Sequence, residues 1–124
     1  MSSSGQLRLV EEQSYRIVEG SPGAEFMTTP EDASILLETC FSHATRIALL
    51  YAENLPAGFF DLSSGQAGAV LQRLRNYGVR LAVVCPPGSA HFSTHFGEMV
   101  AEERQGHFFA IFPDRTTALA WLVE

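Results

Sequence analysis

The sequence predicts an α/β fold in the order β-β-α-β-α-β-α-β-α: a single, mixed, mostly parallel five-stranded sheet flanked by four helices. Three observations predict it. Apolar residues alternate with polar ones near the start of the chain, which is typical of a β-hairpin. Short continuous apolar runs follow, as in strands that are buried on both faces. Between these runs apolar residues recur at helical spacing, and strands that alternate with helices imply right-handed parallel crossovers.

The opening hairpin is predicted by the alternation at Leu7 and Leu9, and again at Tyr15 and Ile17. The polar segment 11–14 between them is the expected turn. Because the hairpin adds one antiparallel pair to strands that are otherwise parallel, we expect a mixed sheet.

The first helix is predicted to begin at Thr29 and Pro30, because threonine caps helices and proline suits the first helical position. Later strands are expected at residues 47–51, 79–84 and 108–112. The helices are predicted by four apolar stripes: Ala33, Leu36, Leu37, Cys40 and Phe41; Ala67, Val70, Leu71, Leu74 and Tyr77; Phe92, Phe96, Met99 and Val100; and Ala118, Leu119, Trp121 and Leu122.

Binding sites of open α/β sheets lie at the carboxyl ends of the strands. At that edge we expect the loops at 61–64 and 85–89 and the end of the last strand at 112–114. The most informative segment is 59–68, which contains Phe-Phe-Asp-Leu-Ser-Ser-Gly and enters a predicted helix.

Two interpretations of this segment stay open on residue chemistry alone. Asp61 and the serines can satisfy free N–H groups, so a well-capped helix explains the pattern. A binding site is the alternative, in which Gly65 and Gly68 let another backbone approach closely. Nearby apolar side chains such as Leu55, Phe59 and Leu62 are candidates for a docking patch, with packing inside the loop as the alternative.

The stretch 60–68, Phe-Asp-Leu-Ser-Ser-Gly-Gln-Ala-Gly, resembles the signature of STAS domains, the anti-sigma-factor antagonist fold. The predicted element order resembles theirs as well. More closely, the chain resembles a small bacterial family of uncharacterised proteins with STAS-like topology, through residues 59–68 and the Leu71-Gln72 pair that follows. The resemblance implies a non-enzymatic regulatory or protein-interaction module that works through the loop and helix start at 59–68.

The resemblance also implies site residues, namely Asp61, Ser63, Ser64 and Gly65. In STAS regulators the first serine of Ser-Ser-Gly accepts a phosphate, which switches partner binding. Counting back from Gly65, that residue is Ser63. Leu62 is inserted relative to the pattern, so Ser64 stays a rival acceptor.

A second set of residues suggests an alternative function. His91, His95, Glu98 and Glu102 follow one another at spacings of four, three and four, which places them on one helix face. Such ligands suit a divalent metal, but a solvated helix flank is the simpler explanation and the one we adopt. With Cys85 nearby as a candidate nucleophile, the alternative is a small-ligand or metal-dependent enzyme that uses the strand-end cleft. Our prediction is no catalytic residue, no metal and no cofactor.

Composition limits the partners. The net charge is −6, from 14 acidic and 8 basic residues, so we expect no binding to nucleic acid. We also expect no membrane association, since no apolar run approaches the roughly 20 residues of a membrane helix. Cys40 and Cys85 are expected to be buried in a cytoplasmic protein. Residues 1–6 are expected to form a flexible tail before one domain at 7–124. A protein partner is expected, and a homodimer stays open.

Overall fold

Five strands form one sheet in the order β1-β2-β3-β4-β5, as the computed structural model of residues 7–88 and 92–123 shows. The first two strands are antiparallel, and the remaining neighbours are parallel. This arrangement confirms the predicted mixed sheet. The strands are β1 (Leu7–Glu12), β2 (Tyr15–Gly20), β3 (Ile47–Tyr51), β4 (Arg80–Val84) and β5 (Phe109–Phe112).

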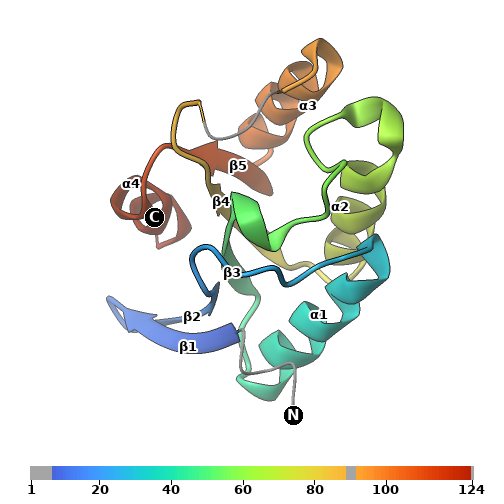
Figure 1. Ribbon diagram of the computed structural model, residues 1–124. Coiled ribbons are helices and arrows are strands. Elements are labelled where there is room, and N and C mark those ends of the chain that lie inside the picture. The colour runs from blue at the N-terminus through green and yellow to red at the C-terminus, as the bar shows by residue number, and fades with distance from the viewer. Residues whose placement is uncertain (1–6, 89–91, 124) are drawn as a thin grey trace.

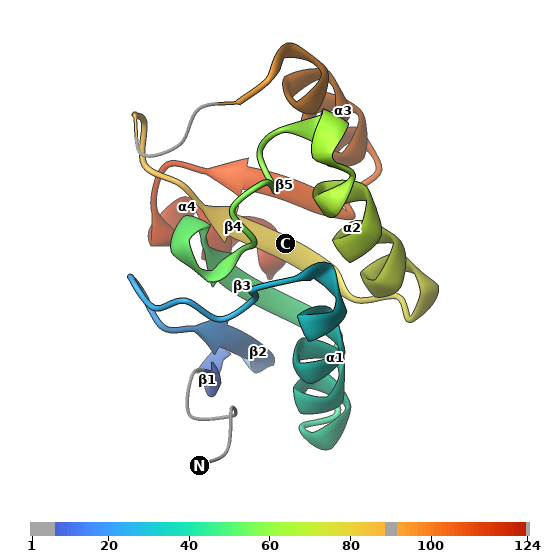
Figure 2. The same cartoon turned by 45° about the vertical axis from the view of Figure 1, so that its right-hand side comes forward.

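Four α-helices cover the two faces of the sheet: α1 (Ala33–Ser42), α2 (Gln66–Asn76), α3 (Thr94–Gln105) and α4 (Arg115–Leu122). Each parallel strand lies beside the one before it, so right-handed crossovers place α1, α2 and α3 on the same face. Figures 1 and 2 show these three helices along one side of the sheet and α4 on the other. Within the described ranges, no helix is both long and apolar enough to cross a membrane.

Three short 3-10 turns, at Pro30–Asp32, Ala52–Asn54 and Leu62–Ser64, modify the predicted element boundaries. At the first, Asp32 Oδ2 accepts hydrogen bonds from the backbone N–H of Thr28 at 2.8 Å and of Thr29 at 3.3 Å. The predicted helix start at Thr29 is therefore the start of a capped 3-10 turn, and regular α-helix begins only at Ala33.

The third helical stripe also needs a correction. Phe92 was expected within this helix, but α3 begins at Thr94 after an N-cap at Ser93. The Ser93 hydroxyl accepts a hydrogen bond from the backbone N–H of Phe96 at 3.2 Å. Phe92 precedes this cap and lies at the rim of the core, with 38% of its surface exposed and its ring 5.1 Å from that of the buried Phe96.

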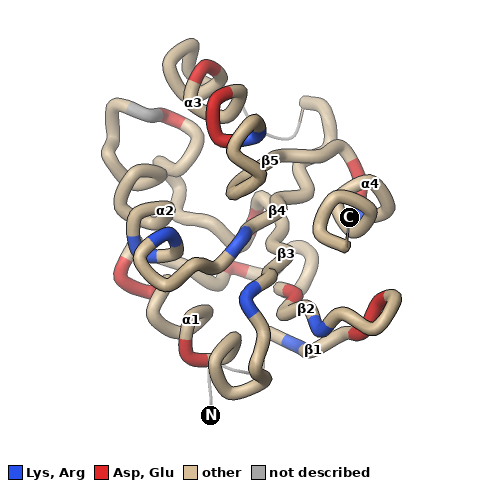
Figure 3. Tube along the Cα trace, turned by 180° about the vertical axis from the view of Figure 1, so that it is seen from behind, with Lys and Arg blue, Asp and Glu red and all other residues tan. Residues whose placement is uncertain are grey.

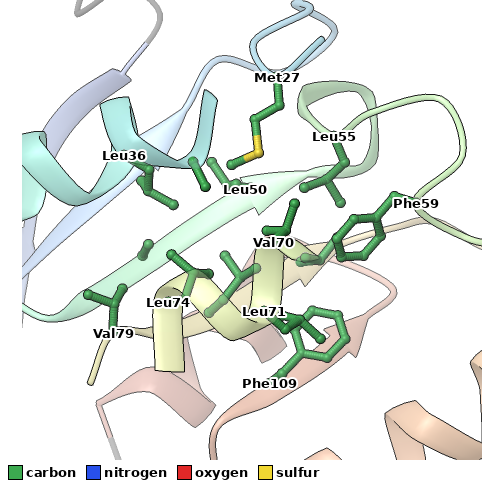
Figure 4. Close-up of a cluster of buried hydrophobic side chains, with 14 of the residues drawn as sticks. Met27, Leu36, Leu50, Leu55, Phe59, Val70, Leu71, Leu74, Val79 and Phe109 are labelled. Atoms are coloured by element: carbon green, nitrogen blue, oxygen red, sulfur yellow. The ribbon is translucent and has the colours of Figure 1, made fainter. Parts of the chain in front are cut away.

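The larger core lies between the sheet and helices α1, α2 and α3. Phe59 is fully buried in it, although it comes from the loop after β3 and not from a regular element. Its ring meets the rings of Phe96 and Phe109 edge-on, at centroid distances of 5.8 and 6.1 Å. Figure 4 shows it among the side chains of this core. Of the two alternatives for Leu55 and Phe59, packing inside the loop is the one observed, because both side chains are buried.

A second core lies under α4, where Trp121 and Leu122 pack against Leu49 and Ala82 of the sheet. Arg80 secures the end of this helix. Its guanidinium lies 4.4 Å from the centre of the Trp121 ring and donates to the carbonyl oxygens of Trp121 and Leu122. A cation at a helix C-terminus complements the helix dipole, so Arg80 helps to fix α4 on this face.

Candidate functional site

Aromatic contacts hold the segment 59–68 against the residues at the start of α3. Phe60 stacks on Phe92 with ring centroids 5.3 Å apart and an interplanar angle of 17°. It also meets the Phe96 ring edge-on at 5.5 Å. The backbone N–H of Ser93 donates to the Phe60 carbonyl oxygen at 3.1 Å. These contacts join the turn to the start of α3.

Asp61 organises the first half of the turn. One of its carboxylate oxygens accepts hydrogen bonds from the backbone N–H of Ser63 at 3.1 Å and from the Ser63 hydroxyl at 2.7 Å. The Asp61 carbonyl oxygen accepts from the backbone N–H of Ser64 at 3.0 Å. Asp61 therefore caps the 3-10 turn at Leu62–Ser64, whereas the sequence suggested that it caps the following helix, which begins only at Gln66.

Ser64 and Gln66 fasten the second half of the turn to Gly58. The Ser64 hydroxyl donates to the Gly58 carbonyl oxygen at 2.6 Å and accepts from the backbone N–H of Gln66 at 3.2 Å. The side-chain oxygen of Gln66 accepts in return from the backbone N–H of Gly58 at 3.1 Å. A side chain at Gly58 would crowd this clamp, since an added Cβ would lie 3.0 Å from Ser64 Oγ.

The two glycines of the segment, Gly65 and Gly68, have different backbone conformations. Gly65 has a φ of 78°, in the left-handed region that glycine adopts at little cost. Gly68 is an exposed residue of α2. Apart from the adjacent residues and the backbone of α2 itself, no described heavy atom lies within 4 Å of an added Cβ at either position. Neither glycine is needed to make room for a neighbouring part of the described chain, and Gly65 is required for its backbone conformation.

Ser63 and Ser64 are both exposed, but their hydroxyls have different partners. The Ser63 hydroxyl donates to the carboxylate of Asp61, which is itself exposed. The Ser64 hydroxyl donates to a backbone carbonyl oxygen within the clamp. A phosphate on Ser63 would lie beside the Asp61 carboxylate, and like charges there would repel and open the capped turn.

The residues of the alternative enzyme site are less organised. His91 lies outside the described residues. The ring of His95 lies 3.3 Å from the Glu98 carboxylate, with both side chains mostly exposed on α3. Glu102 is also exposed on α3. Across the described ranges, no group of three or more histidine, cysteine or acidic side chains could hold a metal ion.

Cys40 and Cys85, the two cysteines of the chain, are buried and are not joined by a disulfide. Burial raises the pKa of Cys40 to about 12, which keeps its thiol protonated. The Cys85 backbone N–H donates to the Phe112 carbonyl oxygen at 2.8 Å and so links the ends of β4 and β5. Both cysteines therefore occupy the buried positions predicted for them.

A charged cluster that the sequence did not predict lies at the carboxyl edge of the sheet, on the side of α4. The Glu19 side chain is fully buried. Its oxygens accept from Arg115 Nε and Nη2 at 2.9 and 3.0 Å, from the Tyr51 hydroxyl at 2.5 Å and from Arg8 Nη2 at 3.4 Å. Figure 3 shows where basic and acidic segments lie along the chain. A usable signal was present, because Glu19 follows the inward-facing Ile17 by two positions in β2 and must share its face.

The pKa values of this cluster follow from these contacts. Burial raises the pKa of Glu19, but hydrogen bonds from Arg115 and Tyr51 and the charges of Arg115 and Arg8 outweigh it, so the pKa lies below 4.5. Burial and the Glu19 carboxylate raise the pKa of Tyr51 to about 12. The hydrogen bond to Glu19 raises the pKa of Arg115. At neutral pH the cluster is therefore an ionised carboxylate held by two cations and a phenol.

Comparisons with known proteins identify a family but no function. A family model described as a domain of unknown function, DUF4180, matches residues 12–122. No curated protein and no solved structure matches the chain.

The two glycines provide a matched test of the turn geometry. Gly65→Ala should lower the free energy of unfolding by about 1–2 kcal/mol, because alanine is strained at a positive φ. Gly68→Ala should raise it by about 0.5–1 kcal/mol, because alanine favours an exposed helix position. Urea denaturation of both variants measures the difference. Equal effects of the same sign would contradict the left-handed conformation at residue 65.

Acid sensitivity tests the Glu19 cluster. The pKa of Glu19 is lower in the folded state than its ordinary value of 4.5. The ionised carboxylate therefore contributes its full stabilisation above pH 4.5, and this contribution is lost as the pH falls through the folded-state pKa. Glu19→Gln should lower the free energy of unfolding at pH 7 by about 1–3 kcal/mol, because the buried hydrogen bonds lose their charged acceptor, while the 39% exposed Arg115 side chain can be rehydrated. Below pH 4.5 the free energy of unfolding of this variant should also depend less on pH than that of the wild type.

Glu11→Gln is the control for this measurement. Glu11 lies on the neighbouring strand, is 71% exposed and has only a 4.0 Å contact with Arg16. Its substitution should change stability by less than about 1 kcal/mol. If the free energies of unfolding of the wild type and Glu19→Gln fall in parallel as the pH falls, the buried Glu19 carboxylate is not ionised in the folded state, which contradicts our interpretation of the cluster.

Proposed function

The chain belongs to the DUF4180 family, whose function is unknown, and we propose that it is a STAS-like, non-enzymatic regulatory module that binds a protein partner through the turn at 59–68. The order of its elements supports the STAS-like part of this proposal, since a hairpin is followed by alternating helices and parallel strands. The position of the turn supports its role, because it lies after β3 at the carboxyl edge of the sheet.

The proposal rests on the observation that the turn is exposed to solvent and is at the same time held in one conformation by its hydrogen bonds. Asp61, Ser63, Ser64 and Gly65 are all exposed. Beneath them Phe59 is fully buried, and the Asp61 and Ser64 side chains bind the backbone of the turn. A surface that is already ordered loses little conformational entropy on binding, which favours affinity for a partner.

Phe92 adds an apolar group to this surface. It is 38% exposed and stacks on Phe60 directly behind the turn. Aromatic side chains are enriched where proteins bind one another. We therefore define the docking surface as Asp61, Ser63, Ser64, Gly65 and Phe92. The loop before it contributes less, because Asn54, Leu55 and Pro56 are buried there.

Ser63 is the residue through which this surface would be switched. Its hydroxyl is exposed and bound only within the turn, whereas the Ser64 hydroxyl is tied to the Gly58 carbonyl oxygen. Phosphorylation adds a charge of about −2. Beside Asp61 that charge would repel the carboxylate, break the cap of the 3-10 turn and change the surface offered to the partner.

The proposal places the module in the cytoplasm of a bacterial cell. Both cysteines are free and buried, as is common in proteins of reducing compartments.

Capture from the native cell with tagged variants tests the proposed switch. Ser63→Asp should lower the recovery of a specific partner at least tenfold relative to the wild type, because it places a second carboxylate beside Asp61. Ser63→Ala should keep the partner, and mass spectrometry should find phosphate on Ser63 of the wild-type protein.

Ser42→Asp is the matched control. Ser42 is exposed at the end of α1, which returns the chain to the start of β3 and so lies at the opposite edge of the sheet. The same substitution there should leave partner recovery unchanged. Equal partner recovery with Ser63→Asp and the wild type would contradict the proposed surface, as would a loss of recovery that Ser42→Asp reproduces.

A further inference from the structure

Among the described residues, no strand pairs with the outer edge of β1. The strand pairs with β2 on one side, and it is the terminal strand of the described sheet. The backbone N–H and C=O groups of such an edge are a template for another strand. At six residues, β1 has the usual length of a strand and is long enough to pair with another strand.

The charges along β1 are complementary to those of a second copy that runs in the opposite direction. The strand reads Leu-Arg-Leu-Val-Glu-Glu, with its basic residue near the start and its acidic residues at the end. Figure 3 shows the acidic segment at the tip of the β1–β2 hairpin. Antiparallel pairing brings the basic part of one strand beside the acidic part of the other. Parallel pairing in register would place Glu11 and Glu12 beside their own copies, which is destabilising.

We propose that the protein forms a homodimer in which β1 pairs antiparallel with β1 of a second copy, about a two-fold axis at Val10. In this register Val10 lies opposite Val10 of the second copy. Arg8 lies opposite Glu12 of the second copy, and the symmetry repeats this pair. The two sheets join into one continuous sheet, and one ladder closes both open edges.

In this register, residues that lie opposite each other across the interface are on the same face of the joined sheet. Val10 packs with the core under α4, whereas Leu9 packs with the core on the opposite face. Because side chains alternate along a strand, Arg8 and Glu12 share the face of Val10. A two-fold axis perpendicular to the sheet keeps α4 on the same side in both copies, so the charged and apolar pairs meet on one continuous face.

Arg8 is already oriented for this contact. Its Nη2 lies 3.4 Å from the buried Glu19 carboxylate, and 62% of its side chain remains exposed. A guanidinium has five N–H donors, so Arg8 can bind Glu19 on one side and Glu12 of the second copy on the other. Across the joined sheets the charges then alternate from Glu12 of the second copy to Arg8, Glu19 and Arg115.

Charge reversal with mixing tests this interface. By sedimentation velocity, the wild-type chain should show a mass of twice 13.6 kDa. Arg8→Glu and Glu12→Arg should each weaken self-association at least tenfold, because like charges then face each other in both pairs. An equimolar mixture of the two variants should form a dimer again, since two acidic positions of one chain face two basic positions of the other.

Controls separate the interface from the fold. Glu11→Arg alters the opposite face, where residue 11 lies beside Leu9 of the second copy, and should change association less than threefold. Circular dichroism of each variant reports on folding, and rescue in the mixture requires that both variants be folded. Val10→Cys should form an intermolecular disulfide on mild oxidation, whereas Leu9→Cys should not, because residue 9 does not face its own copy in this register.

Two results would overturn the proposal. One is a wild-type chain that stays at 13.6 kDa up to several hundred micromolar. The other is a dimer that resists both charge reversals, which would place the interface elsewhere. Neither result bears on the docking surface at the turn, because the substitutions there leave β1 unchanged.

Discussion

The Glu19 carboxylate lies fully buried where β1, β2, β3 and α4 meet. Removing a charge from water costs several kcal/mol unless partners replace the lost hydration. Arg115 from α4, Tyr51 from β3 and Arg8 from β1 supply these partners, so the three elements must be in place together. This requirement fixes the start of α4, and the contacts of Arg80 fix its end. With α4 placed, the second face of the sheet is closed.

The carboxyl edge of the sheet therefore has two parts with different roles. On the α4 side the polar groups satisfy one another inside the protein. On the side of α1 and α2 the chain leaves β3, buries Phe59 and then returns to the surface as the turn at 61–65. The buried ring supplies the packing that an exposed turn lacks, which allows Asp61, Ser63 and Gly65 to stay accessible without becoming disordered.

Most of the fold could be predicted from the sequence, because the hairpin alternates, the buried strands are continuous apolar runs and the helices carry apolar stripes at helical spacing. The site was harder, because a cap can serve either a 3-10 turn or an α-helix, and Asp61 suits both. Gly65 and Gly68 also look alike in sequence, and only the backbone distinguishes the left-handed residue from the helical one. The burial of Glu19 could have been inferred from its two-residue spacing to Ile17, but its partners could not, because they come from residues 8, 51 and 115 and no local pattern joins positions so far apart.

The coupling between Glu19 and Arg115 is most directly tested by a double-mutant cycle. The free energy of unfolding is measured at pH 7 for the wild type, Glu19→Gln, Arg115→Gln and the double variant. If the buried carboxylate holds α4 through this pair, the double variant should lose about 1–3 kcal/mol less than the sum of the two single losses. Additive losses would show that the two side chains contribute independently and would contradict this coupling.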